Sequence, residues 1–253
     1  MDPLMGQQIH GTGTPEQEWR QASCLQDMPR VSLAQLIQDS ARLVVVAPHP
    51  DDEVLGCGGL IAAAQAAGVP VRIVSLTDGE LAYPDAPGWA PRLLAPVRRG
   101  ELEDAVGELG LPVASVVHLG LGDGALSSLQ DRIADALGTL LQPGDLVLVT
   151  WRRDGHPDHE AAARAAETAC SRHAARLLQY PVWAWHWSRP GDGVFEDARA
   201  LRFDLSADIA DAKTRAIARF ATQTGQCTPA IANPILPPHV LERFERRFEV
   251  FFR

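Results

Sequence analysis

Cysteine is scarce in this sequence, and so are long hydrophobic runs. The 253 residues include four widely spaced cysteines, Cys24, Cys57, Cys170 and Cys227, with no CxxC pair. A disulfide scaffold is therefore excluded, and reduced thiols favour a cytoplasmic location. No apolar run approaches the roughly 18–20 residues of a membrane span, so we predict none. Residues Met1–Gly13 lack the charged and then apolar plan of a signal peptide, and we expect a disordered tail there.

Basic charge is also in short supply. There are 23 Lys and Arg against 32 Asp and Glu, which gives a net charge of −9, and Lys213 is the only lysine. An acidic chain has no overall attraction to polyanions, so we predict no nucleic-acid partner. Hydrophobic residues make up 46% of the chain, which is enough for a packed core and excludes intrinsic disorder.

Short apolar runs alternate with longer amphipathic stretches from Ala41 onward, and this alternation indicates the fold class. Strands are predicted at 42–47, 71–76, 113–119, 145–150 and 176–182, and helices at 54–67, 93–109, 126–141 and 159–173. Strands that alternate with helices of this length predict an α/β fold. We expect a Rossmann-like, doubly wound, mostly parallel sheet with helices on both faces.

The pattern changes after residue 182. Trp183, Trp185 and Trp187 alternate with period two, as in a strand, and one face of that strand could stack against a sugar. After these residues we predict a strand at 201–205 and a helix that is capped by Ser206 and runs to about 223. The final segment, 240–252, is expected to start helical and to end strand-like. We predict an N-terminal tail over 1–30 and a single domain over 31–253, with its core at 41–182 and a C-terminal elaboration at 183–253.

Two predicted strands each run directly into a His-Pro-Asp block. The first strand is followed by His49-Pro50-Asp51-Asp52-Glu53, and the fourth leads to His156-Pro157-Asp158-His159. Ligands of open α/β sheets bind at the carboxyl ends of strands, and proline stiffens both turns. Two histidines and one aspartate are a common catalytic zinc set. Taken singly, the acidic groups could instead favour a helix N-terminus, by about 0.3–1 kcal/mol, and Asp158 could be a helix cap.

The stretches VVVAPHPDDEVLGCGG and GHPDHEAA resemble the two signature blocks of the LmbE-like (PIG-L) family of zinc-dependent N-deacetylases. The resemblance is strong over residues 43–175 and weak in the last third. It implies that His49, Asp52 and His159 bind Zn²⁺, with Fe²⁺ as an alternative. It also implies that Asp51 is the general base, that His156 stabilises the oxyanion without ligating the metal, and that Asp158 orients His156.

The resemblance extends to three shorter segments: Thr77-Asp78-Gly79, the pair Arg98 and Glu101, and the loop LGLGDG at 119–124. It implies that Arg98 and Asp123 hold sugar hydroxyls, and Asp154 is assigned to substrate binding with them. Alternatively, Arg98 is an ordinary exposed arginine and Asp123 an ordinary turn aspartate, which the sequence does not distinguish from substrate contacts.

The resemblance implies an enzyme that removes an N-acetyl group from an N-acetylglucosamine-type amino sugar or its conjugate. The expected partner is therefore this small-molecule substrate. Alternatives are an amidase acting on a non-sugar or thiol conjugate, and a catalytically idle binding protein with the same fold. The loops 80–91 and 188–198 fall where the family varies, so the sequence leaves the exact substrate open. It leaves the oligomeric state open as well.

Overall fold

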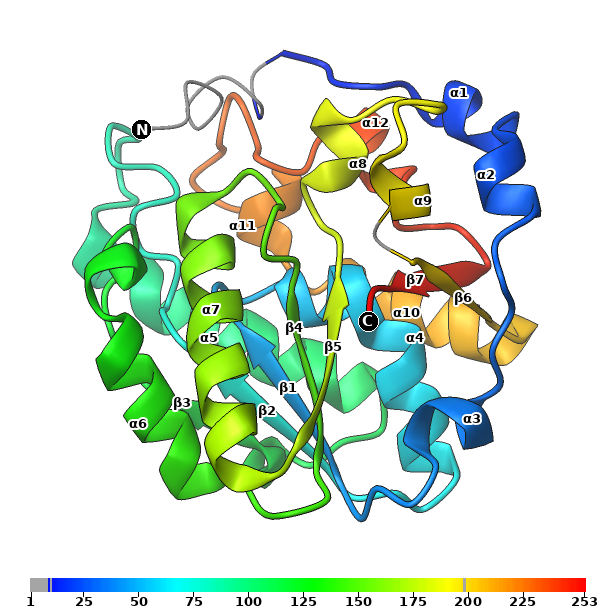
Figure 1. Ribbon diagram of the computed structural model, residues 1–253. Coiled ribbons are helices and arrows are strands. Elements are labelled where there is room, and N and C mark those ends of the chain that lie inside the picture. The colour runs from blue at the N-terminus through cyan, green and yellow to red at the C-terminus, as the bar shows by residue number, and fades with distance from the viewer. Residues whose placement is uncertain (1–8, 10, 198) are drawn as a thin grey trace.

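Five parallel strands form the central sheet, in the order β3-β2-β1-β4-β5. The computed structural model describes residues 9, 11–197 and 199–253 (Figure 1). The sheet strands are β1 (Leu43–Ala47), β2 (Val71–Ser75), β3 (Val116–His118), β4 (Leu146–Thr150) and β5 (Arg176–Tyr180). The predicted α/β, doubly wound fold is confirmed, and the strand order reverses between β1 and β4.

Helices cover both faces of this sheet, as Figure 1 shows. Those of the core are α4 (Asp52–Ala66), α5 (Pro91–Glu108), α6 (Gln130–Leu140) and α7 (Pro157–His173), with the short 3₁₀ turns η1 (Val113–Ser115) and η2 (Leu126–Ser128). The predicted helices agree within a few residues. The 3₁₀ turns occupy the beginnings of the predicted strand 113–119 and helix 126–141.

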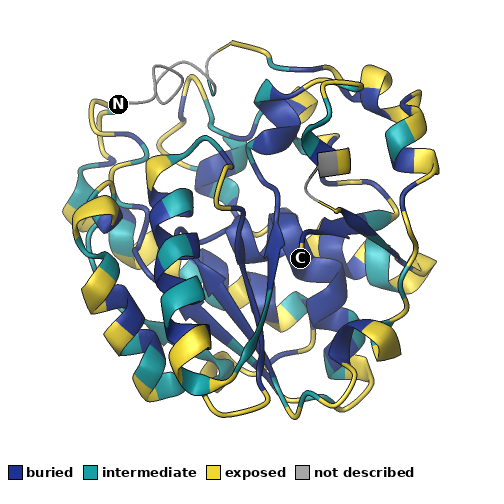
Figure 2. Cartoon of the chain, in the orientation of Figure 1, coloured by how far each residue is buried: buried dark blue, intermediate teal, exposed yellow. Residues whose placement is uncertain are grey.

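Alternate residues of the buried strands point to opposite sides of the sheet. Leu43 and Val45 of β1 join the hydrophobic cluster that contains α4, whereas Val44 and Val46 join the cluster that contains α7. Every residue of β1 and β4 is buried, and the exposed residues lie mainly on the outer helices and loops (Figure 2). Burial on both faces explains the unbroken valine-rich runs of these strands.

The C-terminal part adds helices and a second, two-stranded antiparallel sheet to the core. Its elements are α8 (Ala184–Trp187), α9 (Val194–Asp197), β6 (Leu201–Asp204), α10 (Ala207–Ile217), α11 (Ala221–Thr224), α12 (Pro238–Leu241) and β7 (Phe248–Phe251). The Ser206 cap is confirmed, since its side chain accepts a hydrogen bond from the Ile209 N–H. The helix ends at Ile217 rather than near 223. The predicted tryptophan strand is wrong, because Trp185 and Trp187 belong to α8 and Trp183 is its N-cap.

The predicted N-terminal tail does not hold for the described residues after 13. Helices α1 (Glu16–Arg20), α2 (Ser23–Gln26) and α3 (Leu33–Ile37) precede β1. Trp19 is fully buried, donates a hydrogen bond to the Trp185 carbonyl oxygen, and packs edge-on against that indole. The tail predicted for Met1–Gly13 falls mostly on residues 1–8 and 10, which lie outside the described residues.

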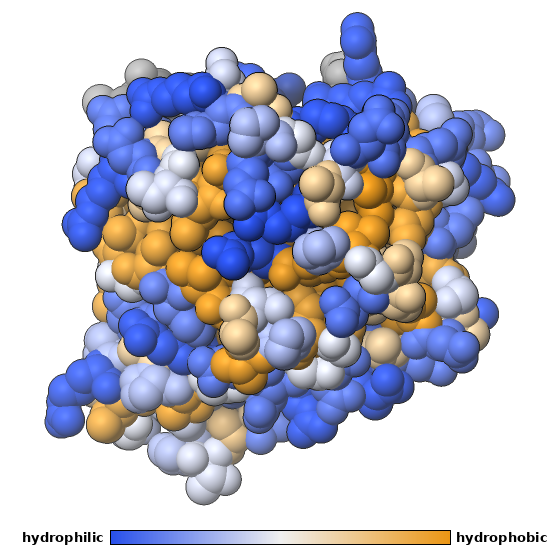
Figure 3. All heavy atoms as spheres, turned by 90° about the horizontal axis from the view of Figure 1, so that it is seen from below, coloured by the Kyte–Doolittle hydropathy of each residue, from blue (hydrophilic) through white to orange (hydrophobic). Residues whose placement is uncertain are grey.

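The carboxyl ends of the strands point upward in Figure 1. Figure 3 views the molecule from below and so shows the opposite end, where hydrophobic patches lie on either side of a central hydrophilic group. In the described part of the chain, no helix is both long and apolar enough to cross a membrane.

Candidate active site

The turn after β1 and the start of α7 bring the two predicted blocks together at the strand-order reversal. His49 and Asp51 lie in the turn between β1 and α4, and Asp52 is the first residue of α4. His156 is the N-cap of α7, and His159 lies in its first turn. Because β1 and β4 are hydrogen-bonded neighbours, the side chains that follow them meet at one edge of the sheet.

His49, Asp52 and His159 converge as predicted for metal ligands. Asp52 Oδ2 lies 3.3 Å from His49 Nδ1 and 3.3 Å from His159 Nε2, and the ligand atoms of all three lie within 4.8 Å of one another. All three side chains are buried. Two imidazole nitrogens and one carboxylate oxygen at this spacing can hold a metal ion.

The hydrogen bonding and the pKa of His159 are consistent with a metal ligand at this position. Its Nε2 is buried and has no hydrogen-bond partner among the described residues, although it faces the Asp52 carboxylate. Burial alone would lower the pKa of His159, but Asp52 and Asp154 raise it to about 9. The surrounding carboxylates therefore favour a positive charge at this position. A bound divalent ion would supply that charge and displace the proton.

Three further carboxylates contact the ring nitrogens of His159 and His49 that are not directed at Asp52. His159 Nδ1 lies 2.8 Å from Asp154 Oδ2, and His49 Nε2 lies 3.3 Å from Asp158 Oδ2 and 3.2 Å from Asp123 Oδ1. His49, Asp123 and Asp158 also satisfy the spacing of a metal group. A ligating histidine usually donates its other ring N–H to a carboxylate. His49 Nδ1 and His159 Nε2 are therefore the ring nitrogens available to an ion, whereas Asp123, Asp154 and Asp158 contact the opposite ring nitrogens.

This arrangement corrects two predicted roles. Asp154 is fully buried, and its oxygens accept hydrogen bonds from the N–H groups of Val182, Trp183 and Ala184, so it is not a substrate contact. The Asp158 carboxylate faces His49 and accepts hydrogen bonds from the backbone N–H groups of residues 124 and 126. Only the backbone N–H of Asp158 reaches His156.

His156 lies beside His49 and His159 but outside both groups of candidate ligand atoms. Its Nδ1 accepts a hydrogen bond of 3.2 Å from the Asp158 N–H, so the neutral ring carries its proton on Nε2. Burial lowers the pKa of His156 to about 3, and the neighbouring His159 and His49 contribute to the shift. Among the described residues it belongs to neither group of close ligand atoms. Its position agrees with a neutral donor rather than a ligand.

Asp51 is held in an unusual conformation by Arg98. The φ of Asp51 is 135°, in a region that residues other than glycine rarely adopt and that occurs preferentially at functional sites. Arg98 Nη2 donates to Asp51 Oδ2 at 3.0 Å and to the Pro50 carbonyl oxygen at 2.6 Å. Burial raises the pKa of Asp51 to about 7, even though Arg98 opposes the shift.

Arg98 thus has a different position from the one predicted for it. It is 3% exposed, and its Nη1 donates to the Gly79 carbonyl oxygen at 2.9 Å. Both terminal nitrogens donate to the protein, and one of them holds Asp51, a contact that the prediction for Arg98 did not include. Sequence alone could not show this, because the partners of Arg98 lie 19 to 48 residues away.

Gly79 allows Arg98 to reach its partners. Its φ is +60°, and a Cβ on this residue would lie 1.7 Å from Arg98 Nη1. We expect Gly79→Ala to displace Arg98 and to lower the free energy of unfolding by about 1–3 kcal/mol, the usual cost of overpacking. Urea denaturation would measure it.

Gly68→Ala is the matched control, because Gly68 has φ of +75° but nothing within 4 Å of its Cβ position. Equal losses of stability in both variants would show that backbone strain, and not the clash with Arg98, causes the effect.

A cavity of about 280 Å³ opens above these residues. His49, Asp51, Asp52, Asp123 and His156 lie at its polar end. The remaining lining residues are mostly apolar: Leu55, Leu81, Ala82, Gly124, Val182, Trp183, Ile235 and Leu236, with Arg98 and Gln223. We call the apolar side chains among them the mouth of the site.

The sequence of this chain is similar to those of known proteins. A family model named PIG-L and described as GlcNAc-PI de-N-acetylase matches residues 44–170. This chain belongs to the PIG-L family. The predicted family is therefore confirmed, and the matched range contains both His-Pro-Asp blocks of this PIG-L chain, including the candidate metal ligands His49, Asp52 and His159.

Individual relatives extend the match. The PIG-L chain is 33% identical over 136 residues to "Probable N-acetyl-alpha-D-glucosaminyl L-malate deacetylase 2" of Bacillus cereus. This match covers 51% of the chain and 61% of that protein. The chain is 32% identical over 188 residues to the Bacillus subtilis protein of the same name, covering 72% and 83%. A solved structure, that of a conserved protein from Thermus thermophilus, matches with a TM-score of 0.55 and 31% identity over 74% of this chain and 81% of that one. The PIG-L chain thus spans less than two thirds of the Bacillus cereus relative.

Proposed function

We propose that this chain is a zinc-dependent hydrolase that removes an N-acetyl group from an N-acetylglucosamine-type amino sugar or its conjugate. The observation that carries the proposal is the position of Asp51. Its carboxylate lies in the cavity beside the ligands His49, Asp52 and His159, and one of its oxygens is anchored by Arg98. The deacetylase names of the two Bacillus relatives support the same chemistry. Fe²⁺ would fit the same donor set.

The ion would act as a Lewis acid on the amide carbonyl and on a water molecule. Asp51 Oδ2 accepts the hydrogen bond from Arg98, and Oδ1 has no hydrogen bond from the described residues, so Oδ1 is the oxygen that can accept a proton from water. The hydroxyl group adds to the acetyl carbon while His156 Nε2–H donates to the carbonyl oxygen as negative charge develops there. Asp51 then returns the proton to the leaving nitrogen as the C–N bond breaks, which releases the amine and acetic acid, and the acid loses its proton to solvent as acetate.

A panel of N-acetylglucosamine conjugates, assayed for free amine, tests this proposal. The zinc-loaded protein should release one amine and one acetate per turnover from at least one amino sugar. Release from non-sugar or thiol-bearing amides alone would favour the amidase alternative. No release from any amide, with zinc bound, would favour a binding protein.

The mouth supports a finer proposal on the substrate. Arg98 is the only basic side chain other than the histidines among the described residues that line the whole cavity, and both of its terminal nitrogens already donate to the protein. Asp51, Asp52 and Asp123 add negative charge at the polar end. An anionic substituent such as malate would find no free cation among these described residues. We propose that the sugar carries an uncharged, partly apolar substituent that lies against Leu81 and Trp183, with Asp123 near its hydroxyl groups.

An aromatic glycoside should therefore be the better substrate. Burial of about 50 Å² of aryl surface is worth roughly 1.3 kcal/mol, or about tenfold in kcat/KM. We expect the phenyl glycoside of N-acetylglucosamine to exceed the L-malate glycoside by at least about this factor. Trp183→Ala should reduce the preference, because it removes apolar surface from the mouth. A higher kcat/KM for the malate glycoside would overturn the finer proposal and leave the deacetylase chemistry intact.

A further inference from the structure

Helix α4, which begins with the ligand Asp52, is broken near its middle. At Cys57 the backbone leaves the helical region, with φ of −146° and ψ of 22°. The segment before the break, residues 52–56, is little more than one turn. An isolated turn of this length has no stability of its own. Its position must therefore be set by contacts from elsewhere in the chain.

Two buried charged residues of the C-terminal part bind at this break. Glu249 of β7 accepts hydrogen bonds from the Gly59 N–H at Oε1, 2.7 Å, and from the Leu60 N–H at Oε2, 2.8 Å. Lys213 of α10 donates to the Leu55 carbonyl oxygen at 2.9 Å and to Glu249 Oε1 at 2.7 Å. Both residues are 3% exposed.

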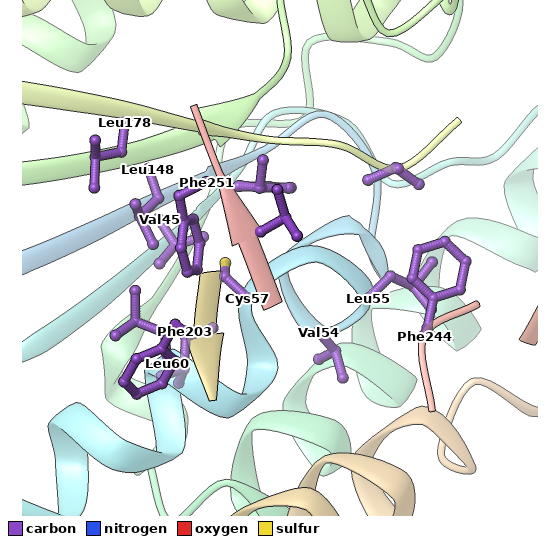
Figure 4. Close-up of a cluster of buried hydrophobic side chains, with 14 of the residues drawn as sticks. Val45, Val54, Leu55, Cys57, Leu60, Leu148, Leu178, Phe203, Phe244 and Phe251 are labelled. Carbon is purple, nitrogen blue, oxygen red and sulfur yellow. The ribbon is translucent and has the colours of Figure 1, made fainter. Parts of the chain in front are cut away.

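The signs of these charges match the two helix ends. The carboxylate serves the free N–H groups at the start of the second segment, and the ammonium serves a free carbonyl at the end of the first. Each charge neutralises the other, so the pair can stay buried. Close packing accompanies it, since Figure 4 shows Phe251 and Phe203, from β7 and β6, among Val45, Cys57 and Leu60.

The first segment connects this break directly to the metal centre. Leu55 lines the candidate site, and its N–H donates to the Asp51 carbonyl oxygen at 2.8 Å while its carbonyl accepts from Lys213. A displacement at the break is therefore passed to Asp51 and Asp52 within one turn of helix. We propose that Lys213 and Glu249 are positioning residues for the metal centre, through which the C-terminal part of the chain sets the orientation of Asp52.

Zinc affinity of the metal-free full-length protein tests this proposal. We expect Glu249→Gln and Lys213→Met to weaken Zn²⁺ binding about 10- to 100-fold, as outer-shell substitutions do. Competition with a chromophoric chelator would measure this without substrate, so the result is independent of the proposed deacetylase activity.

Glu16→Gln is the matched control. Glu16 forms an equally buried ion pair with Arg246, with side-chain exposures of 1% and 6%, but it contacts no part of α4 in the described hydrogen-bond network. It should lose stability with zinc affinity unchanged. If all three variants lost affinity in proportion to their stability, or if the two test variants bound zinc like the wild type, the proposal would be overturned.

Hydrogen exchange of the wild-type protein gives a second measurement should the variants fail to fold. Coupling between two sites is reciprocal, so zinc binding at Asp52 should slow exchange of the Gly59 and Leu60 amide hydrogens. The Gln35 amide, capped by Ser32 in α3, serves as an internal reference and should not change. Equal exchange with and without zinc at residues 59 and 60 would contradict the positioning role.

Discussion

Asp51→Asn is expected to fold, to bind its metal ion and to lose most of its turnover. An amide cannot accept a proton from water, and loss of a general base typically costs roughly 10²–10⁴-fold in kcat. Asparagine has nearly the same size and shape as aspartate, so the backbone with φ of 135° at this position should persist. Metal binding should persist as well, because the proposed ligands are His49, Asp52 and His159. Amine release and elemental analysis on the same preparation would measure both effects.

Asp52→Asn provides the opposite phenotype as a control. Its carboxylate faces both imidazoles, and an amide oxygen is a weaker ligand without charge. We expect metal loss to accompany the loss of activity. If Asp52→Asn kept its metal while Asp51→Asn lost it, the roles of the two neighbouring aspartates would have to be exchanged.

His159→Ala is expected to change the metal content from about one ion per chain to about none, because one of three protein ligands disappears. His173→Ala at the other end of α7 is the matched control and should keep its ion. A full complement of metal in His159→Ala would show that the ligand assignment is wrong.

Asp154→Asn should produce a graded version of the same defect. The carboxylate 2.8 Å from His159 Nδ1 fixes the ring orientation, and loss of such a partner commonly weakens metal binding about 10- to 100-fold. Elemental analysis after dialysis against a weak chelator would distinguish the graded loss from the complete one.

The core of the fold and the convergence of His49, Asp52 and His159 could be predicted from sequence because both depend on local pattern. Strands buried on both faces appear as uninterrupted valine-rich runs, and His-Pro-Asp after such a run places its side chains at the sheet edge. The supporting carboxylates could not be predicted in the same way. The role of Asp154 depends on His159 and on backbone N–H groups almost 30 residues away, so its buried position has no local signature.

The tryptophan segment shows a second limit. Three indoles with period two over five residues fit a strand or a single helical turn equally well. The deciding contact is the Asp154 carboxylate, which accepts the N–H groups of residues 182–184 at the start of α8. Trp19 is a comparable case, since its burial depends on Trp185 and Phe195 from the other end of the chain.

Asp154 also links two properties of the proposed enzyme that would otherwise vary separately. The Asp154 carboxylate orients the His159 ring, and it also fixes the backbone of Val182 and Trp183, whose side chains belong to the mouth. Side chains at these mouth positions can be exchanged without disturbing that backbone, so new substrates can be accommodated by simple substitution. An insertion or deletion between 181 and 184 would move the N–H groups away from Asp154 and release the imidazole. Selectivity at positions 182 and 183 can therefore evolve through side-chain identity, whereas the length of this segment is constrained by the contact between Asp154 and His159.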